Sequence, residues 1–193
     1  NTSAAYGAAC KIDSIASMPM QSFSLSMSTF AAQNIGAGQL GRVRKCYRSC
    51  LMVMLTVSLV ITVGVYFGGD LLMGCFLGAN RSEEVIAIGH EYLKIVSLFY
   101  FVLSISNISS GVLKGSGDLA YFTVCSMVNF VSRLVMAYVL SATALGRSGI
   151  WWSVPIGWSI CGAMLVQRYL SGKWTDKKLA ILKEKSPVPP KTA

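Results

Sequence analysis

The sequence predicts an all-α, polytopic membrane helical bundle with about five transmembrane helices. Of its 193 residues, 53% are hydrophobic and 13% are charged, and the mean hydropathy is +0.56. An average soluble domain has about twice this charged fraction, so we expect lipid to be the solvent for much of the surface. Several apolar stretches reach the roughly 20 residues that a helix needs to cross a bilayer. Helices are the form in which such stretches satisfy their backbone groups in lipid.

The first span is expected at about residues 4–33. One of its faces carries polar residues at three- and four-residue spacing: Ser14, Ser17, Gln21, Ser24 and Ser28. Small hydroxyl residues let membrane helices pack closely, but a polar face can also line a wet cavity, and the sequence leaves both interpretations open. Pro19 should kink this helix because it removes a backbone hydrogen bond. Gly36 and Gly38 should end it, since glycine adopts turn conformations cheaply.

The second span is expected at about residues 46–67, directly behind a run of basic side chains: Arg42, Arg44, Lys45 and Arg48. A basic cluster beside an apolar run marks the cytoplasmic side of a span. The segment from Leu71 to Leu77 is predicted to lie at the opposite interface, followed by a turn at residues 78–80.

The third span is expected at about residues 83–113. Ser82 is a suitable N-cap, and the acidic pair behind it suits the positive end of the helix dipole. Tyr100, Ser104 and Asn107 should share one face of the apolar part. His90 is predicted to be an exposed residue near the helix start, with a proton sensor as the alternative.

The fourth and fifth spans are expected at about residues 120–140 and 149–170. Arg133 lies deep in the fourth span, where an unpaired arginine costs at least about 2.5–3.5 kcal/mol. It can snorkel to the surface, donate to Asn129 or to backbone carbonyls, or pair with a carboxylate, which we expect to lie outside this chain. Trp151 and Trp152 are predicted to anchor the fifth span at the interface.

Charge predicts the topology. The formal net charge is +9, and most of the excess lies at residues 42–48 and 173–191, which the positive-inside rule assigns to the cytoplasm. The domains are therefore a transmembrane bundle at residues 1–172 and a cytoplasmic tail at 173–193. Five spans place the N-terminus outside. Because no signal sequence precedes it, we expect the chain to be the C-terminal part of a larger protein.

The sequence shows no constellation typical of an enzyme. Gly115-Ser116-Gly117 lacks the Lys-Ser/Thr of a phosphate-binding loop and is interpreted as a turn. The six cysteines form no CxxC pair, so no metal site is predicted. The basic segments lie at the ends of apolar runs, which fits membrane orientation and anionic headgroups better than nucleic acid.

Four short patterns, taken together, resemble the MATE family of multidrug and toxic-compound extrusion transporters. They are Gln33-Asn34-Ile35-Gly36-Ala37-Gly38 with Arg42 after it; Gly111-Val112-Leu113-Lys114-Gly115-Ser116-Gly117-Asp118; Gly149-Ile150-Trp151 with Pro155-Ile156-Gly157-Trp158; and Gly172-Lys173-Trp174. The turn residues that carry the resemblance are Gln33, Asn34, Gly36, Gly38, Gly115, Gly117 and Asp118.

The resemblance implies a transporter of twelve helices in two six-helix lobes, of which this chain would be helices eight to twelve. It implies secondary active multidrug efflux across the plasma membrane, driven by Na⁺ or H⁺, with small organic cations as substrates. The fragment should be inactive without the missing N-terminal helices. The alternatives are a lipid-linked saccharide flippase of the same superfamily and a non-transporting truncated remnant.

The resemblance also implies where the coupling ion and the substrate bind. Family members use carboxylates of the first helix, or of the seventh and tenth, and residues 95–113 hold no Asp or Glu. We therefore expect the ion ligands in the missing half, and no cofactor or metal in this chain. The substrate-cavity candidates are Gln21, Ser24, Ser28, Tyr100, Asn107, Asn129 and Arg133. Helix–helix hydrogen bonding is the alternative role for each of them except Arg133.

Overall fold

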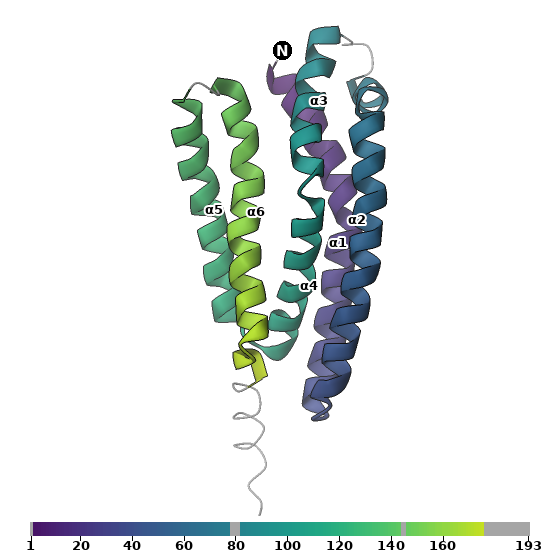
Figure 1. The fold of residues 1–193 in the computed structure, drawn as a ribbon, viewed down its shortest axis with the longest axis vertical. Coiled ribbons are helices and arrows are strands. Elements are labelled where there is room, and N and C mark those ends of the chain that lie inside the picture. Colours follow the sequence, from purple (N-terminus) through teal and green to yellow (C-terminus); the bar gives the residue numbers. More distant parts are fainter. Residues whose placement is uncertain (1, 78–81, 144–145, 176–193) are drawn as a thin grey trace, which may run out of the picture.

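The protein folds as a bundle of long helices (Figure 1). The computed structural model describes residues 2–77, 82–143 and 146–175, which contain helices and no strand. The helices are α1 (Thr2–Gly36), α2 (Leu40–Leu77), α3 (Glu83–Ser97), α4 (Tyr100–Ser116), α5 (Leu119–Ser141) and α6 (Gly146–Leu170). The all-α fold class is confirmed.

The helices have the length and composition of a multi-pass membrane protein. Three stretches are long and apolar enough to cross a bilayer, namely α2, α5 and residues Ser148–Leu170 of α6, and α3 with α4 passes the same test as one bent pair. The remaining helix, α1, runs beside α2 along the bundle (Figure 1), but its many serines and alanines leave it outside this set.

The expected third span is a broken helix in the structure. The axes of α3 and α4 differ by 53° across a break at residues 98–99. The hydroxyl of Thr62 on α2 donates to the carbonyl of Ser97 at 2.8 Å, which satisfies an acceptor at the end of α3. The start of this span is as predicted, because the Ser82 hydroxyl accepts a hydrogen bond from the amide of Val85.

The end of α1 is as predicted from the sequence, whereas α2 extends beyond its predicted span. The first helix ends at Gly36, and Gly38 has a φ of 73°, as predicted for this turn. The second helix continues to Leu77, so the segment Leu71–Leu77 is its last part, and the interfacial position predicted for it stays a prediction. The turn predicted at residues 78–80 and the tail beyond residue 175 lie outside the described residues.

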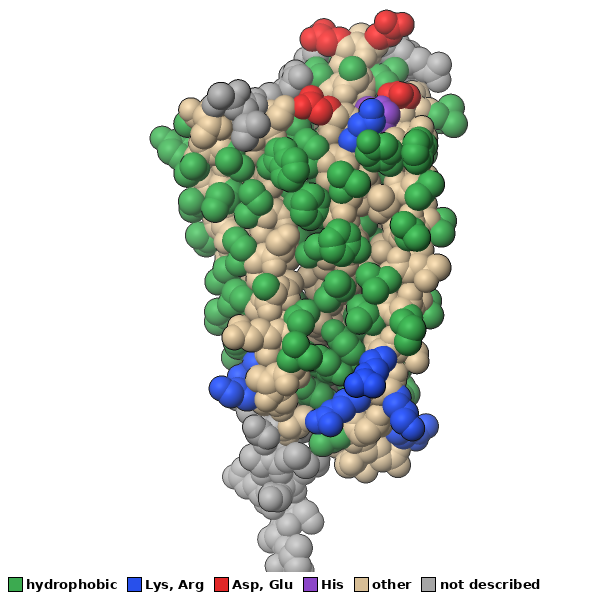
Figure 2. All heavy atoms as spheres, in the orientation of Figure 1, with side chains coloured by type: hydrophobic (Ala, Val, Ile, Leu, Met, Phe, Trp, Pro, Cys, Tyr) green, Lys and Arg blue, Asp and Glu red, His purple; other side chains and the backbone are tan. Residues whose placement is uncertain are grey.

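Charged side chains separate toward the two ends of the bundle. Figure 2 shows most of the visible Lys and Arg side chains at the end where α2 begins and α6 finishes. Asp, Glu and the histidine lie at the end where α3 begins, with a basic side chain beside the histidine. Green apolar side chains cover the surface between them. This is the distribution expected for helices that cross a lipid layer.

Two residues predicted at the surface are buried by partners from other helices. The ring of His90 is 8% exposed; its Nδ1 lies 2.5 Å from an Asp70 carboxylate oxygen and its Nε2 lies 3.1 Å from the Tyr66 carbonyl. Trp151 is 4% exposed and packs between the rings of Tyr6 and Tyr92. His90 was expected to be exposed, and this prediction is wrong. Trp151 faces the protein interior, whereas Trp152 is 37% exposed, and the interfacial anchor expected of this pair stays a prediction.

A candidate substrate cavity

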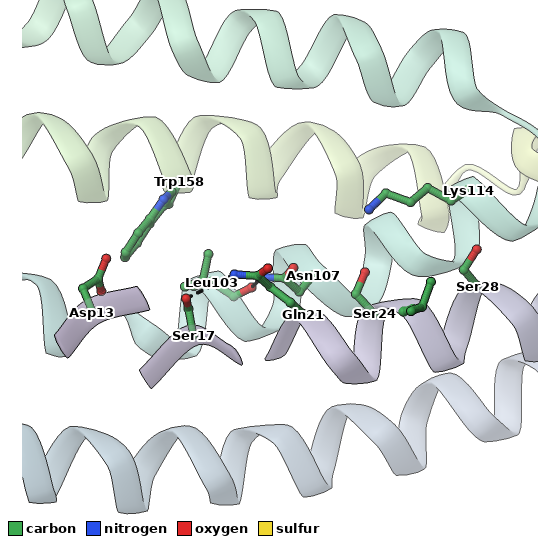
Figure 3. Close-up of a pocket in the computed structure, with 10 residues that line it drawn as sticks. Asp13, Ser17, Gln21, Ser24, Ser28, Leu103, Asn107, Lys114 and Trp158 are labelled. Carbon is green, nitrogen blue, oxygen red and sulfur yellow. Dashed lines mark hydrogen bonds between the residues drawn. The ribbon is translucent and has the colours of Figure 1, made fainter. Parts of the chain in front are cut away.

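A cavity of about 460 Å³ lies between α1, α4 and α6. Figure 3 shows its lining, with Asp13 at one end and Lys114 at the other. Uncharged polar side chains occupy the space between these two charges. The lining residues are Asp13, Ser17, Gln21, Ser24, Leu25, Ser28, Leu103, Asn107, Lys114 and Trp158.

The α1 wall of this cavity is the polar face that the sequence predicts, with one correction at its start. Ser14 is exposed and donates to the carbonyl of Cys10 at 2.8 Å, so it does not line the cavity. The neighbouring Asp13 does. Asp13, Ser17, Gln21, Ser24 and Ser28 follow one another at spacings of four, four, three and four residues, which keeps them on one side of a helix.

Four of the predicted cavity residues meet here: Gln21, Ser24, Ser28 and Asn107. Gln21, Ser24 and Asn107 also make hydrogen bonds within the protein. The Ser24 hydroxyl lies 3.1 Å from that of Ser110 on α4, and the Gln21 amide donates to Ser17 at 3.2 Å. Ser24 therefore combines the two roles that the sequence left open, because it lines the cavity and joins two helices.

Tyr100 does not line the cavity, but it contacts Asp13, the carboxylate of the cavity. Its side chain is completely buried, and its hydroxyl donates to an oxygen of Asp13 at 2.9 Å. Tyr100 is the first residue of α4, so Asp13 lies beside the point where the third span is broken. Asp13 itself is roughly 16 Å along the helix axis from Thr2, at 1.5 Å per residue.

Asn129 and Arg133 line other cavities. Asn129 faces a neighbouring hollow of about 160 Å³ that shares Asn107 and Trp158 with the main cavity. Arg133 lines a separate hollow of about 260 Å³ beside Tyr6 and Ser153. The predicted arginine–asparagine hydrogen bond is absent from the described residues, because the buried Asn129 side-chain oxygen has no partner there.

The stem of Arg133 packs on α6 at Gly157. A Cβ atom at Gly157 would lie 2.5 Å from the arginine Cγ, so only glycine leaves room for it. Within the described residues the guanidinium forms no ion pair.

Sequence reasoning missed Asp13, and a signal for it exists. It is an acidic residue inside a helical stretch that carries no further charge until Arg42. Ionisable residues in membrane helices are costly and therefore mark functional sites. Lys114 was predicted only as part of a turn. In the structure its ammonium group lies at one end of the cavity (Figure 3), and its nitrogen lies 4.4 Å from the centre of the Phe122 ring.

Comparison with known proteins places this helical bundle in a family. The family model MatE matches residues 1–139, which include α1 to α4 and nearly all of α5. The chain belongs to the MatE family. This confirms the resemblance drawn from the four sequence patterns.

Relatives of the chain occur in bacteria and plants. It is 27% identical to the "Probable multidrug resistance protein YoeA" and 28% identical to the "Probable multidrug resistance protein YpnP", both of Bacillus subtilis, over 94% and 90% of the chain. It is 28% identical to "Protein DETOXIFICATION 41" of Arabidopsis thaliana over 82% of the chain. The chain spans 39%, 38% and 31% of these relatives. No solved structure matches it.

The first MatE turn, between α1 and α2, is built from local hydrogen bonds. The Asn34 side chain donates to the carbonyl of Phe30 at 2.8 Å, and the amide of Ala37 donates to the carbonyl of Gln33 at 3.0 Å. Gly36 is the last helical residue, and Gly38 takes the left-handed conformation that glycine adopts without strain. These residues shape a turn and do not reach the cavity.

The second MatE turn joins α4 to α5 and ties both to α6. Gly117 has a φ of 83° and ends α4. Asp118 is 1% exposed, and its carboxylate accepts a hydrogen bond from Nε of Arg168 at 2.7 Å. Gly115 faces α1, where a Cβ would overlap the carbonyl of Ser28. Four helices, α1, α4, α5 and α6, therefore meet at this turn, at one end of the cavity.

The cavity provides no preformed metal site in the described ranges. No group of three or more His, Cys, Asp or Glu side chains lies close enough together there to hold a metal ion. Its one carboxylate, Asp13, accepts a hydrogen bond from Tyr100. Its other polar groups are hydroxyls, amides and one ammonium. Such a lining can bind a proton, or a small cation with help from other groups, and polar organic molecules.

Proposed function

We propose that this chain is part of a secondary active multidrug efflux transporter, in which α1, α4 and α6 form one wall of the drug path. One observation carries the proposal. A cavity of about 460 Å³ inside a membrane bundle holds a carboxylate, Asp13, that is bonded to Tyr100 at the break between α3 and α4. Broken helices are typical of transporter binding sites. Relatives whose names refer to multidrug resistance support the same function.

The coupling cation, H⁺ or Na⁺, is proposed to act at Asp13. A buried carboxylate is most stable when a cation or a proton neutralises it. Tyr100 donates one hydrogen bond to it. A cation or a proton that binds Asp13 competes with this hydrogen bond, which lies beside the α3–α4 break. Further ion ligands, from helices outside this chain, stay a prediction.

The substrate is proposed to be an amphiphilic organic cation. The cavity carries one acid and one base separated by hydroxyl and amide groups, with the ring of Trp158 beside them (Figure 3). An aromatic face and a carboxylate attract organic cations. A saccharide flippase would need a strongly cationic cavity for pyrophosphate, and Asp13 opposes that alternative.

Orientation in the plasma membrane is proposed from charge, with the basic end of the bundle in the cytoplasm. A single cysteine at Ser82, introduced into a variant without native cysteines, should react with an impermeant thiol reagent added to intact cells. A cysteine at Gln39 should react only after the cells are opened. Labelling in the opposite pattern would reverse the orientation.

The function is tested by Asp13→Asn in the complete transporter of which the chain is proposed to be part. Drug export driven by an ion gradient in membrane vesicles should be largely lost, because the coupling cation no longer has a carboxylate to bind. Glu84→Gln is the matched control, because it removes an exposed carboxylate at the end of the bundle. If Asp13→Asn exports drug at the parent rate in both Na⁺ and H⁺ gradients, the proposed coupling site is wrong.

A further inference from the structure

A second polar hollow lies at the basic end of the bundle, away from the drug cavity. Its volume is about 400 Å³, and it forms where α2 begins and α6 ends. It shares no residue with the cavity described above. Its lining consists of Arg44, Tyr47, Arg48, Tyr169, Leu170, Gly172 and Trp174.

Three aromatic rings form a rigid wall of this hollow. The rings of Tyr47 and Tyr169 stack at 3.9 Å with an interplanar angle of 21°, and those of Tyr169 and Trp174 stack at 5.7 Å with an angle of 8°. Hydrogen bonds fix both ends of the stack. The Tyr47 hydroxyl lies 3.0 Å from that of Ser109 on α4, and the indole nitrogen of Trp174 donates to the carbonyl of Tyr169 at 2.9 Å.

The local sequence explains why Trp174 closes the stack. Gly172 has a φ of 71°, a left-handed conformation that ends a helix and that other residues adopt at a cost. It turns the chain back just after α6, so that the indole packs beneath Tyr169 and is only 1% exposed. The wall is therefore formed before any ligand arrives.

Two arginines face this wall without an acidic partner. Arg44 and Arg48 are one helical turn apart, on the same side of α2 as Tyr47. Both are exposed, and no carboxylate in the described part of the chain pairs with either. By contrast, two other arginines have partners. Arg42 donates to the Gln39 side chain, and Arg168 pairs with Asp118. Two guanidinium groups that have no acidic partner among the described residues therefore line this hollow.

We propose that this hollow binds the phosphate headgroup of an anionic phospholipid. Guanidinium groups match phosphate oxygens in geometry and charge, and basic pockets between membrane helices are suited to lipid headgroups. Tyr and Trp side chains are at home at the headgroup level. Leu170, at the rim, is 75% exposed and offers an apolar contact to the acyl chains. The site joins α2 to α6, and its existence does not depend on what the transporter exports.

The test measures lipid retention by native mass spectrometry of the protein purified from membranes in mild detergent. Phosphatidylglycerol, the probe, should remain bound more than phosphatidylcholine of the same chain length. The double variant Arg44→Gln/Arg48→Gln should weaken phosphatidylglycerol binding by roughly 25-fold. This corresponds to about fivefold, or about 1 kcal/mol, for each hydrogen bond lost between a guanidinium group and the phosphate, a contact that general attraction to a basic surface does not provide.

The matched control is Arg42→Gln/Lys45→Gln, which removes the same charge from the same stretch of α2 but outside the hollow. It should retain most of the bound phosphatidylglycerol. An equal loss in both double variants would show only general attraction to a basic surface and would overturn the proposal. Displacement of the lipid by millimolar inorganic phosphate would assign the pocket to a soluble phosphate and overturn it as well. Unchanged elution in size-exclusion chromatography verifies that each variant is folded.

Discussion

The helix pairs α1–α4 and α5–α6 are held together in different ways. Where α4 meets α1, glycine faces backbone: a Cβ at Gly111 would lie 2.5 Å from the carbonyl oxygen of Ser24. Side chains then join the helices through the Ser24–Ser110 and Tyr100–Asp13 hydrogen bonds. Where α6 meets α5, Gly149 also faces backbone, because a Cβ there would lie 2.5 Å from the carbonyl oxygen of Leu140, but Gly157 accepts the stem of Arg133. Of the residues of α5, only Cys125 is buried.

This difference separates a polar, closely packed surface from an apolar, exposed one. The α1–α4 pair is closely packed, rich in hydroxyl groups and lines the main cavity, whereas α5 presents apolar side chains such as Phe130 and Tyr138 on its outer surface. Small residues allow close approach in membranes, where the hydrophobic effect does not drive association. Polar groups therefore occur where two helices can satisfy them, and the cavity forms along that line.

The largest expected effect comes from breaking the contact that joins the two pairs. Arg168→Leu removes the positive charge beside Asp118, a carboxylate that is 1% exposed. Removing one partner of a buried ion pair costs about 3–5 kcal/mol, so the thermal midpoint of the purified protein should fall clearly. The double variant Arg168→Leu/Asp118→Leu should recover much of this loss, because no charge stays buried. A double variant no more stable than Arg168→Leu would contradict this account of the contact.

A smaller effect tests the close approach of α1 and α4. Gly111→Ala places a methyl group against the Ser24 carbonyl and should destabilise the protein by about 1–3 kcal/mol, as overpacking does. Gly64→Ala is the matched control, since it is also inside a helix but has no atom within 4 Å of the added carbon. It should be neutral or should stabilise the helix by up to about 1 kcal/mol. Equal thermal midpoints for the two variants would show that the α1–α4 contact is looser than the structure has it.

The features that the sequence predicts correctly depend on neighbouring residues. The turn at Gly38 needs a left-handed conformation, and the Ser82 cap needs an acceptor three residues before Val85. Apolar composition over long windows suffices for the fold class. A helical repeat also placed Gln21, Ser24 and Ser28 on one face, and these residues line one cavity.

The features that the sequence does not reveal depend on residues far away in the chain. The break between α3 and α4 contains neither Gly nor Pro, and it is supported by Thr62 of α2. His90 is buried because its ring lies over Gly69, where any Cβ would overlap it. Asp13 and Ser14 point in directions that differ by about 100° around α1. Which of them faces the cavity depends on the position of α4, and the sequence does not give that position.

The smallest expected effect measures what the hydroxyl pair of α1 and α4 contributes. A double-mutant cycle of Ser24→Ala and Ser110→Ala, read by thermal unfolding in detergent, should give a coupling free energy of about 0.6 kcal/mol, the average for hydrogen bonds between membrane helices. Ser22→Ala is the control, because Ser22 is exposed and its hydroxyl donates to the carbonyl of Met18 on its own helix.

In the complete transporter, Ser24→Ala should also change the apparent affinity for drug, because Ser24 lines the main cavity. Ser110→Ala should act through stability alone, because Ser110 lines only the smaller cavity beside it. If the two single variants have identical drug affinities, Ser24 only joins the two helices. The drug path would then be assigned to Gln21 and Asn107.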